Sequence, residues 1–205
     1  MINLLCKTFS FIFFSLIISS CSDNTILQPL PMDATVLAFG DSLTYGTGTS
    51  RDKAYPTILE QLLQRKVINA GKPGEITRDG LLRLPSLLDR HQPELVILCH
   101  GGNDILRKMN RSHTKDNLQK MINLIQQENS QIIIVGVPEF GLFLNAAPIY
   151  TELANQNNLT IENDILSDLL GTNSLKSDHI HPNAKGYQQL AESIHTLLKH
   201  AGAVN

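Results

Sequence analysis

Short apolar runs alternate with longer amphipathic segments along most of the chain. The apolar runs predict strands that are buried on both faces, because they contain few polar residues at alternating positions. The predicted strands are Val36–Phe39, Val67–Asn69, Leu95–Cys99, Gln131–Val137 and Thr160–Glu162. The amphipathic segments repeat their apolar residues at helical spacing. The predicted helices are Tyr55–Lys66, Arg78–Arg90, Thr114–Gln127 and Asn183–His200.

Two features of the helical segments refine this pattern. In the segment Arg78–Arg90 the leucines are expected to lean to one side, and Pro85 predicts a bend or a break. Strands that alternate with helices predict a parallel sheet with helices on both faces. We therefore expect one three-layer α/β/α domain over residues 35–205, with its ligand site at the carboxyl ends of the strands.

The first 20 residues differ in character from the rest of the chain. Lys7 is their only charged residue, and the segment between Lys7 and Cys21 is mostly apolar. This segment is shorter than the roughly 20 residues that span a bilayer, and it predicts a signal peptide over residues 1–20. The sequence Leu16-Ile17-Ile18-Ser19-Ser20-Cys21 resembles a bacterial lipobox. The resemblance implies a lipid on Cys21, and the alternative is an ordinary signal peptide with an incidental cysteine.

Residues 21–34 contain two prolines and little pattern, and they predict a tether between the lipid and the domain. The protein is therefore expected to be exported and anchored to a membrane facing the periplasm, with the outer membrane favoured over the inner. Processing would remove Cys6 and lipidation would occupy Cys21, which leaves Cys99 without a disulfide partner. Cys99 ends an apolar run and is predicted to be a small buried residue, with a lone nucleophile as the alternative.

Composition excludes several classes of protein. The chain has 17 Lys and Arg against 19 Asp and Glu, so it has no basic excess for binding nucleic acid. A hydrophobic fraction of 42% with 18% charged residues is not typical of a disordered chain. The chain has no Trp, which disfavours a stacking platform for sugars.

Polar residues that could carry chemistry follow the predicted strands. Gly40-Asp41-Ser42-Leu43 follows the first strand, and a serine on a tight strand-to-helix turn occupies the position that a nucleophile needs. Gly74 follows the second strand in a turn with Pro73. Gly101-Gly102-Asn103-Asp104 follows the third strand, where Asn103 can present amide donors and Asp104 is expected to be a helix cap or a local hydrogen-bond partner.

A carboxylate and two histidines lie close together near the C-terminus, in Asp178-His179-Ile180-His181. A carboxylate three residues before a histidine can orient the Nδ1 atom of that ring and leave the other nitrogen for a nucleophile. A metal site made of Asp178, His179 and His181 is the alternative. The other histidines are expected at solvated positions or helix ends: His91, His100, His113, His195 and His200.

These four blocks, in this order, resemble those of the SGNH (GDSL-type) hydrolases, over about residues 36–200. The branch that is most similar contains periplasmic thioesterases, lysophospholipases and arylesterases. The resemblance implies a five-stranded parallel sheet in the flavodoxin-like order 2-1-3-4-5. It implies Ser42 as nucleophile, His181 as base and Asp178 as its acidic partner. It also implies an oxyanion hole made of the backbone N–H groups of Ser42 and Gly74 and the side chain of Asn103.

One block departs from the pattern of that branch, because Pro73-Gly74-Glu75 stands where Ser-Gly-Asp-Thr is frequent. The departure is expected to affect substrate contacts more than the role of Gly74. Leu142, Phe143 and Leu144 lie in the segment Phe140–Ile149, and they are candidates either for an acyl pocket or for the core.

The expected function is that of a serine ester hydrolase acting on a small acyl ester or thioester, with no metal, cofactor or nucleic acid and no obligate protein partner. A carbohydrate or cell-wall O-acetylesterase would use the same residues. A flavodoxin-like binding lipoprotein that holds a phosphate in the loop Thr44–Ser50 is an alternative from another class, as is an inactive lipoprotein.

Overall fold

A five-stranded parallel sheet lies at the centre of the domain in the computed structural model, which describes residues 27–139 and 144–205. Its strands lie in the order β2 (Lys66–Gly71), β1 (Thr35–Gly40), β3 (Leu95–Cys99), β4 (Gln131–Val135) and β7 (Thr160–Glu162). Every neighbouring pair is parallel. Numbered within this sheet, the order is 2-1-3-4-5, so the predicted topology is confirmed.

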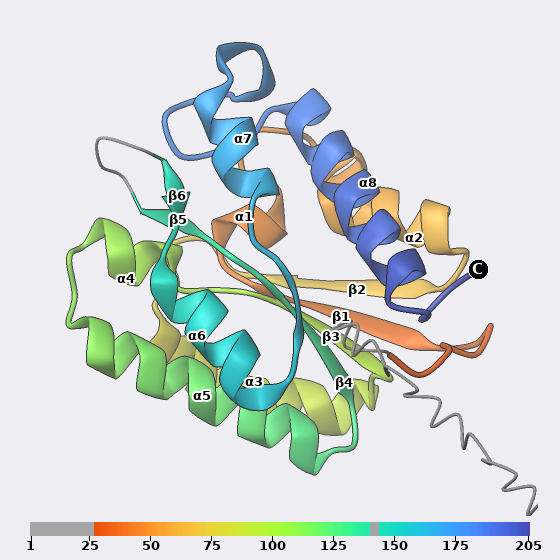
Figure 1. The fold of residues 1–205 in the computed structure, drawn as a ribbon. Helices are drawn as coiled ribbons and strands as arrows, with labels where there is room; N and C mark the ends of the chain where they lie inside the picture. Colours follow the sequence, from red (N-terminus) through yellow and green to blue (C-terminus); the bar gives the residue numbers. More distant parts are fainter. Residues whose placement is uncertain (1–26, 140–143) are drawn as a thin grey trace, which may run out of the picture.

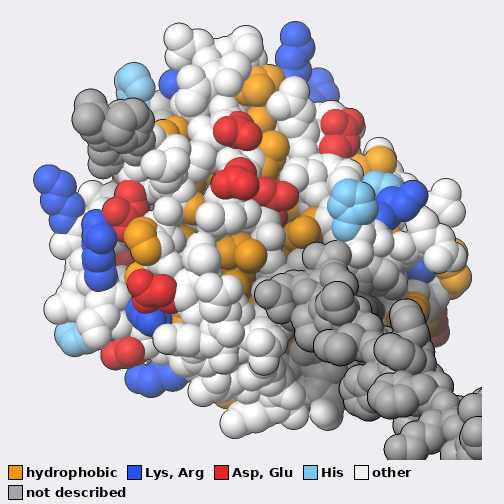
Figure 2. Space-filling model, viewed as in Figure 1, with side chains coloured by type: hydrophobic (Ala, Val, Ile, Leu, Met, Phe, Trp, Pro, Cys, Tyr) orange, Lys and Arg blue, Asp and Glu red, His pale blue; other side chains and the backbone are white. Residues whose placement is uncertain are grey.

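Helices cover both faces of the sheet, as Figure 1 shows. On one face α2 (Tyr55–Leu63) packs against α8 (Ala184–His200), and on the other α3 (Thr77–His91) packs against α5 (Arg111–Gln127). Two further helices complete these layers, with α6 (Pro148–Asn157) against α5 and α7 (Ile165–Gly171) against α8. The predicted three-layer architecture is therefore confirmed. Figure 2 shows the face that carries α6 and α7, where acidic side chains gather around α7 and hydrophobic ones are scattered between polar ones.

Three helices differ from their predicted form. Helix α2 ends at Leu63 because Gln64 adopts a left-handed conformation that stops it. Helix α3 continues through Pro85, so the break that the proline could have caused is absent, and Leu82 on this helix is 78% exposed instead of facing the core. Burial of Leu84 and Leu88 holds the helix on the domain, so packing outweighs the proline.

Helix α5 begins three residues earlier than predicted. Its N-cap residue, Asn110, accepts hydrogen bonds from the backbone N–H groups of Ser112 and His113. This first turn is polar and carries no apolar periodicity, so the hydrophobic pattern alone does not reveal it. The helices α6 and α7 were not predicted either.

Residues 27–34 pack on the domain and are not a free tether. The backbone N–H groups of Leu27 and Leu30 donate to the carbonyl oxygens of Ala201 and Ala203, both at 2.8 Å, and both leucine side chains are buried. These apolar contacts and backbone hydrogen bonds show that residues 27–34 belong to the folded domain, whereas a tether was predicted for them. Residues 1–26, with the predicted signal peptide and Cys21, lie outside the described residues, as do Leu142 and Phe143. Within the described ranges, no helix is both long and apolar enough to cross a membrane.

The parallel register brings three strand ends level with one another. Gly40 at the end of β1 pairs with Gly71 at the end of β2 and with Cys99 at the end of β3. The segments that follow these strands therefore meet at one edge of the sheet. This edge also carries the short helices α1 (Ser42–Tyr45) and α4 (Gly102–Leu106), together with the ribbon of β5 (Pro138–Glu139) and β6 (Asn145–Ala146).

Candidate active site

Ser42 lies at the first position of α1, directly after a tight turn. Asp41 caps this helix, since its side chain accepts a hydrogen bond from the Leu43 N–H at 3.1 Å. The turn requires glycine at position 40, because a Cβ atom there would lie 2.1 Å from the carbonyl oxygen of Cys99. As the first residue of a helix, Ser42 has a backbone N–H without a partner inside that helix.

A short loop before α8 holds Asp178 and His181. An isolated bridge between Lys176 and Pro182 closes the loop. One carboxylate oxygen of Asp178 accepts hydrogen bonds from the backbone N–H groups of Ile180 and His181, both at 2.8 Å. The other oxygen lies 2.8 Å from Nδ1 of the His181 ring. Asp178 therefore fixes both the loop and the ring.

The His181 ring connects this loop to Ser42, which is 139 residues away in sequence, with its Nε2 atom 3.0 Å from Ser42 Oγ. Because an ionised carboxylate only accepts, Nδ1 carries the proton in the neutral ring and Nε2 is free to accept from the serine hydroxyl. Partial burial acts to raise the pKa of Asp178, but hydrogen bonds from His181 and from the Ile180 N–H outweigh it and hold that pKa below its ordinary value. Asp178 is thus ionised at neutral pH.

The side chain of Asn103 lies beside Ser42. Its Nδ2 atom lies 3.0 Å from the Glu75 carbonyl oxygen and 3.2 Å from Asp41 Oδ2, so both amide hydrogens have acceptors in this structure. Asp41 is buried, and burial raises the pKa of its carboxyl group. One small hollow is lined by Asp41, Ser42, Asn103 and His181, among others.

Gly74 has a φ of +75°, a conformation that favours glycine. Among the described residues, no hydrogen-bond acceptor is found for its backbone N–H. Gly74 precedes Glu75, whose carbonyl oxygen Asn103 binds, but it is not among the residues that line the hollow around Ser42. The structure thus brings together Ser42, Asp178, His181 and Asn103 directly, and Gly74 through its neighbour.

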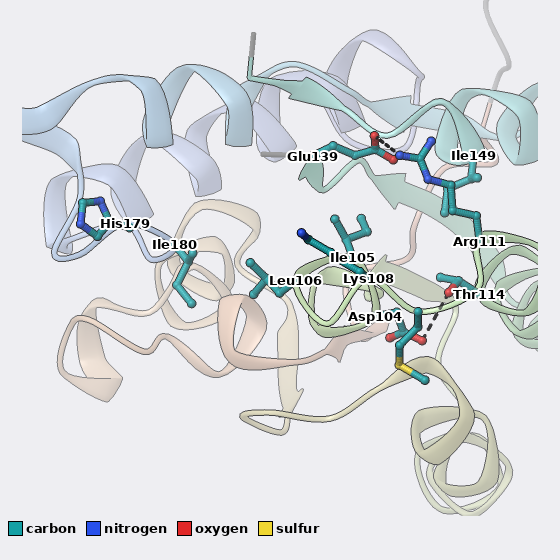
Figure 3. Close-up of a pocket in the computed structure, with 11 residues that line it drawn as sticks. Asp104, Ile105, Leu106, Lys108, Arg111, Thr114, Glu139, Ile149, His179 and Ile180 are labelled. Atoms are coloured by element: carbon teal, nitrogen blue, oxygen red, sulfur yellow. Dashed lines mark hydrogen bonds and ion pairs between the residues drawn. The ribbon is translucent and has the colours of Figure 1, made fainter. Parts of the chain in front are cut away.

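A larger cavity of about 440 Å³ adjoins this hollow and shares Leu106 and Ile180 with it. In Figure 3 these two side chains lie near each other, whereas Arg111 and Glu139 form an ion pair at another part of the wall, with 2.7 Å between Nη2 and Oε2. The cavity is lined by Asp104, Ile105, Leu106, Lys108, Met109, Arg111, Thr114, Glu139, Ile149, His179 and Ile180. These residues come from separate segments of the chain, so no local sequence motif predicts the cavity.

Asp104 and Cys99 have different outcomes. Asp104 was expected to be a helix cap or a local hydrogen-bond partner, but it binds a distant residue: it accepts from the N–H of Thr77, 27 residues earlier, at 2.9 Å and from the Thr77 hydroxyl at 2.6 Å. Cys99 is fully buried, and burial raises the pKa of its thiol above the ordinary range. His179 is exposed and lines the larger cavity, away from the contact between His181 and Ser42. Among residues 27–139 and 144–205, no three His, Cys, Asp or Glu side chains are grouped to hold a metal ion.

The prediction for His100 was wrong. Its side chain is completely buried instead of solvated, with Nε2 3.3 Å from Glu75 Oε2 and Nδ1 accepting from the Gly101 N–H at 2.8 Å. The departure at Glu75 was also misread, because its carboxylate faces this buried histidine and not the substrate side. A single polar residue after an apolar strand does not reveal such a partner.

Known proteins share both the sequence and the fold of this chain. The profile of the GDSL-like lipase/acylhydrolase family matches residues 38–189. The chain belongs to this family. Membership in the GDSL-like lipase/acylhydrolase family identifies the protein as an ester hydrolase.

Two relatives in the GDSL-like family illustrate the similarity. The chain is 28% identical over 196 residues to "Esterase TesA" of Pseudomonas aeruginosa, which covers 90% of this chain and 98% of the relative. It is 31% identical over 166 residues to "Thioesterase 1/protease 1/lysophospholipase L1" of Escherichia coli, which covers 77% of this chain and 80% of the relative.

Solved structures agree with this membership. A crystal structure of TesA superposes with a TM-score of 0.73 at 26% identity, covering 82% of this chain and 99% of the other. AlinE4, described as an SGNH-hydrolase family esterase, superposes with a TM-score of 0.65 at 30% identity, covering 82% of this chain and 96% of the other.

Proposed function

We propose that this protein hydrolyses carboxylic esters or thioesters with Ser42 as the nucleophile, His181 as the general base and Asp178 as the orienting carboxylate. The observation that carries the proposal is the continuous contact from Asp178 through His181 to Ser42, with distances of 2.8 and 3.0 Å. No other described part of the chain offers a serine to a histidine that a carboxylate orients.

The geometry supports a reaction in two halves. Ser42 Oγ attacks the acyl carbonyl carbon while its proton passes to His181 Nε2, and Asp178 stabilises the imidazolium that forms. The C–O or C–S bond then breaks, and the leaving alcohol or thiol takes that proton. Water attacks the acyl-enzyme with His181 again as base, and the acid is released as Ser42 regains its proton.

The negative charge that develops on the carbonyl oxygen needs donors. We assign this role to the backbone N–H groups of Ser42 and Gly74 and to the amide of Asn103. Asn103 Nδ2 makes its longer hydrogen bond to Asp41 Oδ2, at 3.2 Å. We expect the hydrogen of this bond to turn towards the oxyanion. The bond to the Glu75 carbonyl oxygen then remains and holds the amide in place.

The neighbouring cavity supports an acyl group as the part of the substrate that is recognised. Five of its eleven lining residues are apolar, and two of these, Leu106 and Ile180, also line the hollow around Ser42. Apolar side chains at the part of the cavity next to Ser42 favour a substrate with an acyl chain over an acetylated sugar. The loop of the flavodoxin-like alternative is less suited to a phosphate, because the Thr44 hydroxyl is buried and lies 3.3 Å from the Tyr55 hydroxyl.

The direct experiment replaces Ser42 and measures hydrolysis of p-nitrophenyl butyrate by the purified domain. We expect Ser42→Ala to lower kcat by about 10⁴-fold or more, because the nucleophile is lost, while circular dichroism and thermal unfolding stay unchanged. Ser86→Ala is the matched control, since Ser86 is exposed on α3 and its hydroxyl bonds only a backbone carbonyl oxygen of the same helix. Full activity in Ser42→Ala would remove the proposed nucleophile.

We also propose that the chain is exported and carries lipid on Cys21. The support is the apolar segment and the lipobox-like sequence before that cysteine. Gln28 pairs with Gln131 at the start of β4, so the chain enters the domain at the edge opposite Ser42. Five residues separate Cys21 from Leu27, so an anchored domain would present its site away from the membrane. Radiolabelled palmitate should enter the expressed protein but not Cys21→Ser, and equal labelling of both would contradict this proposal.

A further inference from the structure

Beneath Gly74 and Asn103 lies a buried ionic cluster that the proposed mechanism does not use. The side chain of Glu75 is 1% exposed, and its carboxylate binds the Arg83 guanidinium through two atoms, with Nε 3.0 Å from Oε1 and Nη2 2.6 Å from Oε2. Nε2 of His100 lies 3.3 Å from the same Oε2 atom. We call Glu75, Arg83 and His100 the buried cluster.

The direction of the histidine contact follows from its second nitrogen. Nδ1 of His100 accepts a hydrogen bond from the Gly101 N–H, so the neutral ring carries its proton on Nε2 and donates it to Glu75. Gly80 on α3 makes room for this ring, because a Cβ atom there would lie 2.4 Å from Nε2. Every polar atom of the buried ring is therefore used.

The buried cluster joins the three strand ends around the site. Arg83 on α3 donates to the carbonyl oxygen of Ala70 on β2 at 3.1 Å and lies 4.5 Å from the ring centre of Phe39 on β1. His100 follows β3 directly. The carboxylate of Glu75 thus sits at a point where the ends of β1, β2 and β3 are held together.

Glu75 itself connects the buried cluster to the proposed oxyanion hole. Its side chain points down to Arg83 and His100, while its carbonyl oxygen accepts from Asn103 Nδ2 at 3.0 Å. Gly74 precedes it, and the Glu75 N–H closes that turn on the Lys72 carbonyl oxygen at 3.2 Å. Burial acts to raise the pKa of Glu75, but hydrogen bonds from His100 and Arg83 outweigh it and bring the pKa to about 2. The carboxylate is therefore ionised and held at both oxygens.

We infer that Glu75 is a positioning residue for the hydrolysis reaction: its carboxylate, held by Arg83 and His100, fixes the peptide that orients the Asn103 amide and the Gly74 N–H. This inference rests on the proposed function. Glu75 contacts neither Ser42 nor the cavity, so it acts through the two donors and not on the substrate. Loss of its charge should therefore weaken transition-state stabilisation and leave substrate binding in place.

A double-mutant cycle with Asn103 tests this inference. Glu75→Gln keeps the size of the side chain but places an amide NH₂ group against the donors of Arg83 and His100. With p-nitrophenyl butyrate we expect kcat to fall by about 10- to 100-fold, with KM changed less than about two-fold, because a misplaced donor affects the transition state alone. In the Asn103→Ala background the same substitution should lower kcat by a smaller factor than in the unchanged protein, because the part of its effect that passes through Asn103 is already lost and only the part through the Gly74 N–H remains.

Lys72 provides the matched control. Its ammonium group lies 3.4 Å from the same carboxylate but is 63% exposed, so Lys72→Gln removes a solvent-side contact and should leave kcat unchanged. Arg83→Lys serves as a second variant where Glu75→Gln folds poorly, because it keeps the positive charge and loses the two-atom contact. It should also lower kcat while changing KM little. Its effect on kcat should again be smaller in the Asn103→Ala background than in the unchanged protein.

The outcomes separate this inference from the proposed function. Full additivity of Glu75→Gln and Asn103→Ala, or a change confined to KM, would overturn the positioning role alone. An unchanged kcat in both Glu75→Gln and Arg83→Lys would do the same. If Asn103→Ala has normal kcat, its oxyanion role and this inference both fail, whereas activity in Ser42→Ala contradicts the proposed nucleophile itself.

Discussion

Two carboxylate–histidine pairs lie near the same edge of the sheet, and they differ in what surrounds them. Asp178 and His181 are 2.8 Å apart, with side chains 50% and 12% exposed. Glu75 and His100 are 3.3 Å apart, with side chains 1% and 0% exposed. The residue types are nearly the same in both, so their chemistry must come from their other contacts.

The second ring nitrogen decides the role of each histidine. Nε2 of His181 faces a hydroxyl group, Ser42 Oγ, which can give up a proton. Nδ1 of His100 instead faces the backbone N–H of Gly101, which cannot. Arg83 also neutralises Glu75, whereas no cation contacts Asp178 among the described residues apart from His181. The exposed pair is arranged for proton transfer, and the buried pair holds the backbone that surrounds it.

Removing the negative charge from the exposed pair should have a larger effect on catalysis than removing it from the buried pair. In Asp178→Asn the new NH₂ group faces Nδ1, which favours the tautomer with its proton on Nε2, where it cannot accept from Ser42. We expect kcat for p-nitrophenyl butyrate to fall by about 10²- to 10⁴-fold, with little change in the thermal unfolding midpoint because Asp178 is half exposed. Asp168→Asn, on the exposed side of α7, is the control. A kcat within about three-fold of normal would show that Asp178 does not orient His181.

The buried pair should instead be visible in stability against pH. Glu75 has its pKa lowered to about 2, below an unfolded-state value of about 4.3, so its contribution is present above pH 5 and is lost as the pH falls. The difference between the two pKa values corresponds to about 3 kcal/mol of folding stability, which is lost progressively as the pH falls from 5 to below 2. The free energy of unfolding, measured with urea, should fall between pH 6 and pH 3 in both proteins. In Glu75→Gln this fall should be smaller than in the unchanged protein by on the order of 2 kcal/mol. Equal losses in the two proteins would show that Glu75 is not held in this way.

The sequence predicted the exposed pair more readily than the buried one for a physical reason. Asp178 and His181 are three residues apart, so their contact is local and the spacing alone suggests it. The strand Leu95–Cys99 was predicted within its observed bounds because it is apolar throughout. The sheet order followed from the family resemblance, and the parallel arrangement followed from the alternation of strands and helices.

The buried cluster and the cavity depend on contacts between distant segments. His100 meets Glu75 from 25 residues away and fits only because position 80 is a glycine. The cavity combines residues from α4, the segment before α5, α5 itself, β5, α6 and the loop before α8. No single stretch of sequence carries either feature, so both appear only when the strand ends are brought together.

Covalent trapping tests the central claim most directly, namely that Ser42 is the nucleophile that His181 activates. The purified protein is treated with a fluorophosphonate, and the modified peptide is mapped by mass spectrometry. We predict one phosphonyl group per chain, attached to Ser42 Oγ, with matching loss of esterase activity and no adduct in Ser42→Ala. An adduct on a different residue, or complete inhibition while Ser42 remains unmodified, would contradict the proposed mechanism.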